Sequence, residues 1–282
     1  MPHDLLRALA IFAVGLAAGT INTVVGSGTL ITFPTLLAFG YPPVLANVSN
    51  NVGLVPGVAS GVYGYRSELG GQRRRLIRLG SASVGGGLVG AILLLTLPQS
   101  AFKDIVPALI GLAVVMVIIQ PRLAKWVAER QRARAALATP DGAGAGTGAD
   151  GASAVAVAAP PAAAEAIGGP VLWVLVFLAG IYGGYFGAAQ GVLLIGMLGI
   201  ALNDSLQRIN AAKNVLAGLV NGLAAVVFIL ATHVDWGVAG LIAAGSIIGG
   251  QVGARLGKRL PPWGLRVVIV CVGTAALIKL LA

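Results

Sequence analysis

The amino-acid sequence predicts an all-α protein that crosses a lipid bilayer several times. Of its 282 residues, 57% are hydrophobic and only 10% are charged, whereas soluble domains carry about 25% charged residues. The apolar residues gather in runs that mostly have the length of one helix across a hydrocarbon core of about 30 Å. The basic residues lie between these runs, for example at 73–78 and 130–134. These observations exclude a soluble enzyme, a disordered chain and a coiled coil, and the runs are too long for the strands of a membrane barrel.

Eight apolar segments follow one another along the chain, and two of them are too long for a single crossing. Glycine and polar residues interrupt each of these two near its middle. Such breaks predict discontinuous helices or re-entrant hairpins, because unpaired backbone at membrane depth is tolerated only inside protein or beside a wet cavity. The segments are 5–40, 43–65, 79–97, 104–120, 170–202, 209–232, 236–254 and 265–281, of which the first and the fifth are broken.

The chain divides into an N-terminal membrane repeat, residues 1–128, and a C-terminal membrane repeat, residues 170–282. We expect residues 129–169 to be a flexible cytoplasmic linker. Most of this tract is alanine, glycine and proline, which cannot bury enough apolar surface to fold. The single cysteine, Cys271, lies in an apolar run, so no disulfide can form within the chain.

The two repeats resemble one another at a nearly constant offset. Ala18-Gly19 and Gly26 match Ala179-Gly180 and Gly187 at an offset of 161 residues. A two-residue insertion then raises the offset to 163, which holds through the following segments. Pairs at this offset include Gly28 with Gly191, Asn47 with Asn210, Asn50 with Lys213, Asn51 with Asn214, Gly86 with Gly249 and Gly90 with Gly253. We interpret the pattern as two homologous four-segment halves.

The charges of the loops indicate that the two halves are inverted relative to each other. Loop 66–78, after the second segment, is basic, and the loop after the third carries only Lys103. In the second half, loop 232–235 has no lysine or arginine, whereas residues 255–266 are basic. Because basic loops stay in the cytoplasm, each half then needs an odd number of crossings, which a re-entrant first segment supplies. The alternative is eight plain crossings and parallel halves.

Lys213 is the only charged residue well inside an apolar segment. All nine acidic residues lie in loops or at segment ends, so the carboxylates of a cation cage or a proton relay are missing. Lys213 stands about nine residues into its segment, about 13 Å from its end, which is deep for a lysine that reaches back to the interface. A membrane interior with one lysine and no acid favours an anionic ligand. The alternative is a lysine that does reach the interface.

Polar groups that can donate hydrogen bonds to an oxyanion surround Lys213 and its repeat partner Asn50. Buried asparagine is costly unless it is hydrogen-bonded, so we expect these side chains to face the protein interior. Half-helices that begin at the glycine breaks would also aim free backbone N–H groups at the membrane midplane. The alternative is that the polar side chains only hold helices together. The predicted substrate-binding residues are Lys213, Asn47, Asn50, Asn51, Asn210, Asn214, Asn22, Ser27, Gln190, Gly26, Gly28, Gly187 and Gly191.

The sequence contains no motif of a membrane enzyme. It has no His-Glu-x-x-His, no catalytic carboxylate pair and no serine with a plausible base, and His3 and His233 are isolated. We therefore expect no catalytic residue, no metal and no cofactor. The net charge of +10 reflects retained loops, and we expect no nucleic-acid partner.

At these residues the sequence resembles the TauE/SafE family of sulfite exporters and organosulfur-anion permeases. In the first half, the similarity runs from Ala18-Gly19 through Gly26-Ser27-Gly28-Thr29 to Asn47-x-x-Asn50-Asn51. In the second half, it includes Asn210-x-x-Lys213-Asn214 and Val234-Asp235-Trp236. The resemblance implies a membrane protein with duplicated four-segment halves. It also implies that the cargo is a small sulfur-containing anion such as sulfite or a sulfonate.

We therefore expect a secondary transporter, exporter or permease, of small anions in the bacterial inner membrane. Alternating access would rock two inverted halves around a site near the midplane. The alternative function is a passive anion channel. The expected partners are the small anion and the lipid bilayer, and a homodimer is left open beside a monomer.

Overall fold

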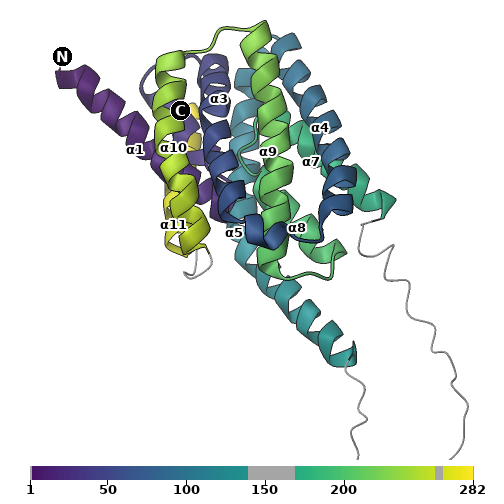
Figure 1. Cartoon of the computed structure of the whole chain (residues 1–282). Helices are drawn as coiled ribbons and strands as arrows, with labels where there is room; N and C mark the ends of the chain where they lie inside the picture. The colour runs from purple at the N-terminus through teal and green to yellow at the C-terminus, as the bar shows by residue number, and fades with distance from the viewer. Residues whose placement is uncertain (1, 139–168, 258–262, 282) are drawn as a thin grey trace, which may run out of the picture.

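The computed structural model describes residues 2–138, 169–257 and 263–281, and over these residues the chain is a bundle of α-helices without strands (Figure 1). Five helices are long and apolar enough to cross a membrane. The helices are α1 (Pro2–Val24), α2 (Thr29–Ala38), α3 (Pro43–Gly64), the 3₁₀ helix η1 (Arg66–Leu69), α4 (Arg73–Thr96), α5 (Gln99–Ala138), α7 (Pro170–Tyr185), α8 (Gln190–Ala201), α9 (Leu206–Ala231), α10 (Trp236–Leu256) and α11 (Trp263–Leu281).

Helix α5 is longer than the apolar segment 104–120 that predicts it. It continues to Ala138, so the first residues of the predicted linker 129–169 are helical. The rest of that linker, 139–168, lies outside the described residues.

Both long apolar segments are broken where their glycines predict a break. α1 gives way to α2, and α7 gives way to α8, through short turns. Gly26 and Gly187, which match in the repeat, have φ angles of 89° and 76°, a conformation that glycine adopts without a steric penalty. α2 then runs back along α1, since Gly28 packs against Ala18 and the Arg7 guanidinium donates to the Phe39 carbonyl at 2.7 Å. The first broken segment is therefore a helical hairpin.

Helices of one half pack against helices of the other half in matching pairs. α1 packs on α10 and α4 packs on α7; α3 packs on α10 and α4 packs on α9. α1, α3 and α4 are the repeat counterparts of α7, α9 and α10, so each of these interfaces occurs twice. Glycine makes the contacts close: a Cβ added at Gly19 would overlap the Ser246 backbone, and one at Gly86 would overlap the Phe177 backbone.

The order of contacts gives the relative directions of the helices. Gly57 lies against Ser246 and Gly64 against Ala254, so α3 and α10 run in the same direction. Tyr65, just after α3, packs in one buried cluster with Ala211 near the start of α9, whereas an added Cβ at Gly218, further along α9, would lie 3.2 Å from Val58 within α3. The repeat counterparts α3 and α9 therefore run in opposite directions.

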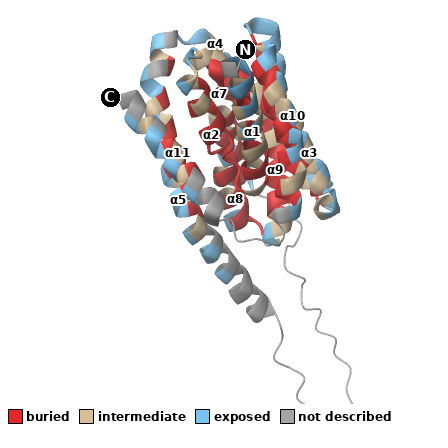
Figure 2. Ribbon diagram, turned by 90° about the vertical axis from the view of Figure 1, so that its left-hand side faces the viewer, coloured by how far each residue is buried: buried red, intermediate tan, exposed pale blue. Residues whose placement is uncertain are grey.

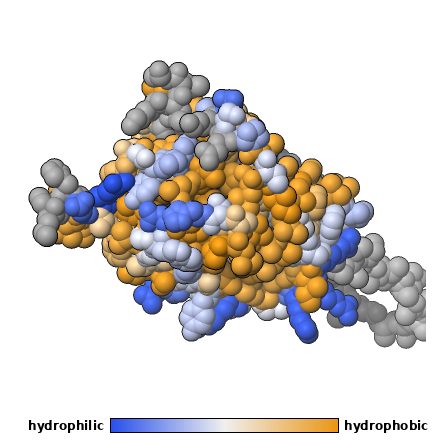
Figure 3. Space-filling model, turned by 90° about the horizontal axis from the view of Figure 1, so that it is seen from above, coloured by the Kyte–Doolittle hydropathy of each residue, from blue (hydrophilic) through white to orange (hydrophobic). Residues whose placement is uncertain are grey.

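The basic loop after α3 lies beside the end of α10, at one end of the bundle. A Cβ added at Gly257 would lie 2.8 Å from the Tyr65 hydroxyl, which places the start of loop 66–78 beside the end of α10. Arg75 and Arg208 bind Asp204 at this end, at 2.8 and 2.6 Å. Figure 3 looks onto the opposite end, where hydrophobic residues cover much of the surface and hydrophilic ones are interspersed.

Buried residues concentrate in the middle of the bundle, around α1, α2, α8 and α9 (Figure 2). Large apolar side chains remain on the outside, including Val171, 70% exposed, and Leu230, 81% exposed. A continuous apolar exterior around a partly polar interior is the arrangement that a lipid solvent requires.

Candidate functional site

The two glycine breaks meet in the interior of the bundle. The Gly191 N–H donates to the Gly26 carbonyl at 3.2 Å, and a Cβ on either glycine would overlap the backbone of the other. Their neighbours Ser27 and Gln190 are 0% and 2% exposed. The tips of the two hairpins therefore touch backbone to backbone at a place that is closed to solvent.

Lys213 projects from α9 to the end of α1. It is 0% exposed, and its Nζ donates to the carbonyls of Asn22 and Thr23 at 3.0 and 3.1 Å. Carbonyls in the last turn of a helix have no partner within that helix and carry the negative end of its dipole. The ammonium therefore caps the broken helix, and the alternative of a lysine that reaches back to the interface is wrong.

Two asparagines of α9 strengthen the same cap. The side-chain amides of Asn210 and Asn214 donate to the Thr23 carbonyl at 3.2 and 3.4 Å. Three of the predicted site residues thus converge on the end of α1. Asn22, a fourth, takes part through its backbone carbonyl.

The end of α7 has a simpler version of this cap. Asn47, the repeat counterpart of Asn210, donates from α3 to the Tyr185 carbonyl at 3.0 Å. Asn50 stands where the other half has Lys213, and its amide donates instead to Thr29 Oγ1, at the start of α2, at 3.3 Å. The side-chain oxygen of Asn51 has no hydrogen-bond partner among the described residues. Each half therefore caps the broken helix of the other half, but only one cap is charged.

Several buried polar groups beside the breaks lack a hydrogen-bond partner within the described part of the chain. They include Ser27 Oγ, Asn50 Oδ1 and Gln190 Nε2. The backbone N–H groups of Ser27, Gly28 and Thr29 also donate to no other described residue. Unpaired buried polar groups are costly and uncommon. Here they gather where α2 begins, the helix end that favours negative charge.

Sequence reasoning missed the aromatic wall beside the breaks. The rings of Phe33 and Phe186 lie 5.2 Å apart, and Phe102 lies 5.7 Å from Tyr185. The Tyr185 hydroxyl is buried without a described partner. Sequence position could have indicated it, because Tyr185 and Phe186 immediately precede Gly187 at the second break. The wall excludes water from one side of the hairpin tips.

The site contains no described carboxylate cluster. Groups of three or more histidine, cysteine, aspartate or glutamate side chains that could hold a metal ion are absent from the described residues. The chemistry that the arrangement offers is hydrogen-bond donation and one positive charge.

Apolar helices around two broken hairpins, whose tips meet at a closed polar centre, are typical of multi-pass membrane transporters. The chain belongs to the TauE/SafE family: a family model described as "Sulfite exporter TauE/SafE" matches residues 11–280. This confirms the predicted family and the class of membrane transporter, and a transporter family agrees with the expectation that the protein is not an enzyme.

Curated relatives carry transporter names. The probable membrane transporter protein YfcA of Escherichia coli K12 is 25% identical over 96% of this chain and 88% of its own length. A probable membrane transporter protein of Haemophilus influenzae is 26% identical over 90% of this chain and 85% of its own. The probable membrane transporter protein ORF9 of a Sinorhizobium species is 24% identical, with 96% and 91% covered. No solved structure matches the chain.

Proposed function

We propose that the protein is a secondary transporter of small anions, with sulfite or sulfonate-type organosulfur anions as its substrates, in the bacterial inner membrane. The observation that carries this proposal is the fully buried Lys213, which has no acidic partner among the described residues and binds the end of α1, just before the break at Gly26. A buried positive charge without a carboxylate favours an anion.

The unused donors at the breaks support an anionic ligand. An ammonium has three N–H donors, and Lys213 uses two of them on carbonyls of α1. The third N–H of the ammonium remains for a ligand. Further unused donors at the breaks are Ser27 Oγ, Gln190 Nε2 and the first N–H groups of α2. Oxygens of a sulfite or sulfonate group accept hydrogen bonds in several directions, which suits donors that come from both hairpins.

An inverted repeat is the second part of the proposal. Its support is that α3 and α9 run in opposite directions, that the inter-half interfaces occur in matching pairs, and that the basic loop after α3 begins beside the end of α10, where Arg255 lies. Basic loops favour the cytoplasmic side, so that end faces the cytoplasm.

The units that move would be two bundles of mixed origin rather than the two sequence halves. One bundle consists of α1, α3 and α10, and the other of α4, α7 and α9. Within each bundle, glycines bring backbones into contact. The caps, in contrast, cross between bundles: Lys213 reaches from α9 to α1, and Asn47 reaches from α3 to α7. Rocking of the bundles would then remake the bonds that surround the substrate.

Cross-linking tests which units move. In a Cys271→Ser background, a disulfide between cysteines at Ser60 and Gln251 joins α3 to α10, which already touch through Gln251 Nε2 and the Ser60 carbonyl at 2.8 Å. A disulfide between cysteines at Val58 and Gly218 joins α3 to α9. We expect transport to survive the first disulfide and to stop with the second until it is reduced. Loss of transport with the first disulfide would contradict mixed bundles.

The function itself is tested in proteoliposomes with a panel of anions that includes sulfite, a sulfonate, sulfate and chloride. We expect saturable uptake and counterflow for sulfite or a sulfonate. Conductance without saturation or counterflow would favour the passive anion channel, and equal flux of every anion would remove the proposed substrate class.

A further inference from the structure

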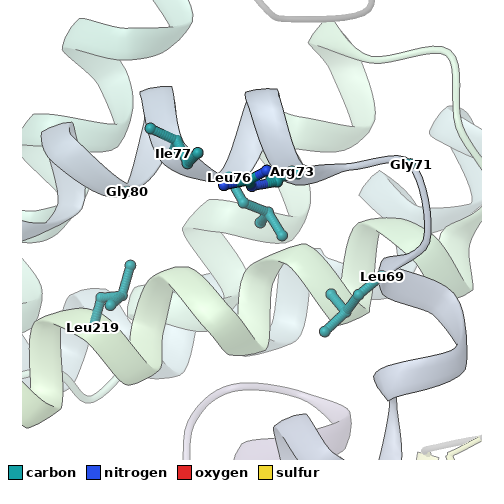
Figure 4. A pocket seen from close by; sticks show the side chains of 7 residues that line it. All are labelled: Leu69, Gly71, Arg73, Leu76, Ile77, Gly80 and Leu219. Carbon is teal, nitrogen blue, oxygen red and sulfur yellow. The ribbon is translucent and has the colours of Figure 1, made fainter.

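Figure 4 shows a groove beside the start of α4, whose lining includes none of the residues at the glycine breaks. It lies between η1, α4 and α9 and has a volume of about 440 Å³. Its lining residues are Leu69, Gly71, Arg73, Leu76, Ile77, Gly80 and Leu219. The groove is therefore walled mainly by apolar side chains and has one arginine at its rim.

The apolar walls face outward. Ile77 is 63% exposed and Leu219 is 40% exposed. Gly80 keeps the groove open, because a side chain there would crowd Leu219: an added Cβ would lie 3.1 Å from a methyl carbon of Leu219. From Arg73 to Gly80 the groove follows seven residues of α4, about 10 Å at 1.5 Å per residue. This length accommodates the glycerol region and the upper part of an acyl chain.

The charges at the rim are unevenly neutralised. Arg75 binds Asp204, but Arg73, Arg74 and Arg78 are exposed, and their side chains form no hydrogen bond or ion pair with another described residue. Helix α4 also begins here, without a side-chain cap at Gln72. Guanidinium groups bind phosphate oxygens in pairs of parallel hydrogen bonds. The rim therefore attracts a phosphate, and the walls attract a hydrocarbon.

We propose that this groove binds an anionic phospholipid, with the phosphate at Arg73 and its neighbours and one acyl chain between α4 and α9. An anionic phospholipid fits because its headgroup complements the charge of the arginines and its acyl chain fits the apolar walls. A zwitterionic lipid would fill the walls without neutralising the arginines. Basic pockets between membrane helices bind anionic headgroups in this way. The site is independent of the proposed transport function, since it requires only that the protein lies in a bilayer.

Native mass spectrometry of the full-length protein in detergent, with added phosphatidylglycerol or phosphatidylcholine, tests the proposal. We expect preferential retention of phosphatidylglycerol. Arg73→Gln should weaken that retention about fivefold, which corresponds to about 1 kcal/mol per basic residue at a membrane surface. Arg255→Gln removes an exposed charge that does not line this groove, and should change retention by less than about twofold.

A second variant probes the walls without changing the charge. Leu219→Trp fills the groove and should release phosphatidylglycerol, while Arg73→Lys should retain it because the charge remains. Equal losses in Arg73→Gln and Arg255→Gln would show that only diffuse charge attracts lipid, and would overturn the site. Equal retention of both lipids, or complete displacement by inorganic phosphate alone, would also overturn it.

Discussion

The ends of the two broken helices, α1 and α7, occupy equivalent places in the repeat but are capped differently. The end of α1 receives an ammonium and two amides, from Lys213, Asn210 and Asn214. The end of α7 receives one amide, from Asn47. Asn50, the counterpart of Lys213, turns to the start of α2 instead. One duplicated position therefore holds a charge in one half and a neutral polar group in the other.

In the proposed inverted repeat, this difference would give a symmetric scaffold an asymmetric site. A single positive charge suits a singly charged anion, whereas two lysines in matching places would repel each other in a medium of low dielectric constant. The neutral half contributes donors, and the charged half contributes both donors and charge. Substitutions of Lys213 and of its counterpart Asn50 therefore test whether the two helix ends differ in function.

The largest effect is expected from Lys213→Met. The variant removes the buried ammonium and leaves the Asn22 carbonyl without its described donor. We expect substrate binding to weaken by about 2 kcal/mol or more, which corresponds to a loss of at least about 30-fold in flux. Flux of sulfite or a sulfonate in proteoliposomes measures it. Lys125→Met, which replaces an exposed lysine, is the matched control and should transport normally. Normal flux in Lys213→Met protein that is folded and monodisperse would remove the lysine from the site.

A smaller effect is expected when the charge is moved to the other half. Lys213→Asn combined with Asn50→Lys exchanges the two matched residues. If the hairpins are equivalent, the new ammonium can reach the end of α7. Flux should then exceed that of Lys213→Asn alone by about threefold or more, which corresponds to a modest coupling energy between the two positions. The same vesicle assay compares the two proteins. No recovery would show that the halves are not interchangeable at this position.

The smallest effect concerns stability. Asn47→Ala leaves the Tyr185 carbonyl without its described side-chain donor and should lower the free energy of unfolding by about 1–3 kcal/mol. Asn214→Ala leaves the Thr23 carbonyl with Lys213 and Asn210 as donors, and should cost about 0.5–1.5 kcal/mol. Thermal unfolding in detergent ranks the two variants. The reverse order would mean that the cap on α1 depends on all three donors.

The fold was predictable where a local pattern determines it. Glycine runs within overlong apolar segments predicted the breaks, and Gly26 and Gly187, which the offset pairs, both have positive φ angles. The pairing of α1 with α10 and of α4 with α7 was not predictable. A repeat offset relates helices to their counterparts, but it does not say which helix of the other half each one packs against.

The site was predictable as a set of residue types but not as a geometry. Lys213 and the asparagines stood out because polar groups in apolar segments are costly. Their partners are backbone carbonyls of Asn22, Thr23 and Tyr185, and a carbonyl is present at every residue. Only the three-dimensional placement of a helix end identifies which carbonyls need a donor, so the caps could not be seen in the sequence.

The contact between Gly26 and Gly191 has a consequence for how substrate choice can diverge. The junction is made of peptide groups, which stay the same when the flanking side chains change. In the proposed transporter, selectivity among anions would then depend on the flanking residues Ser27 and Gln190, which are buried and still have unused polar atoms. Replacing those two residues should change the preferred anion while the contact between Gly26 and Gly191 stays intact.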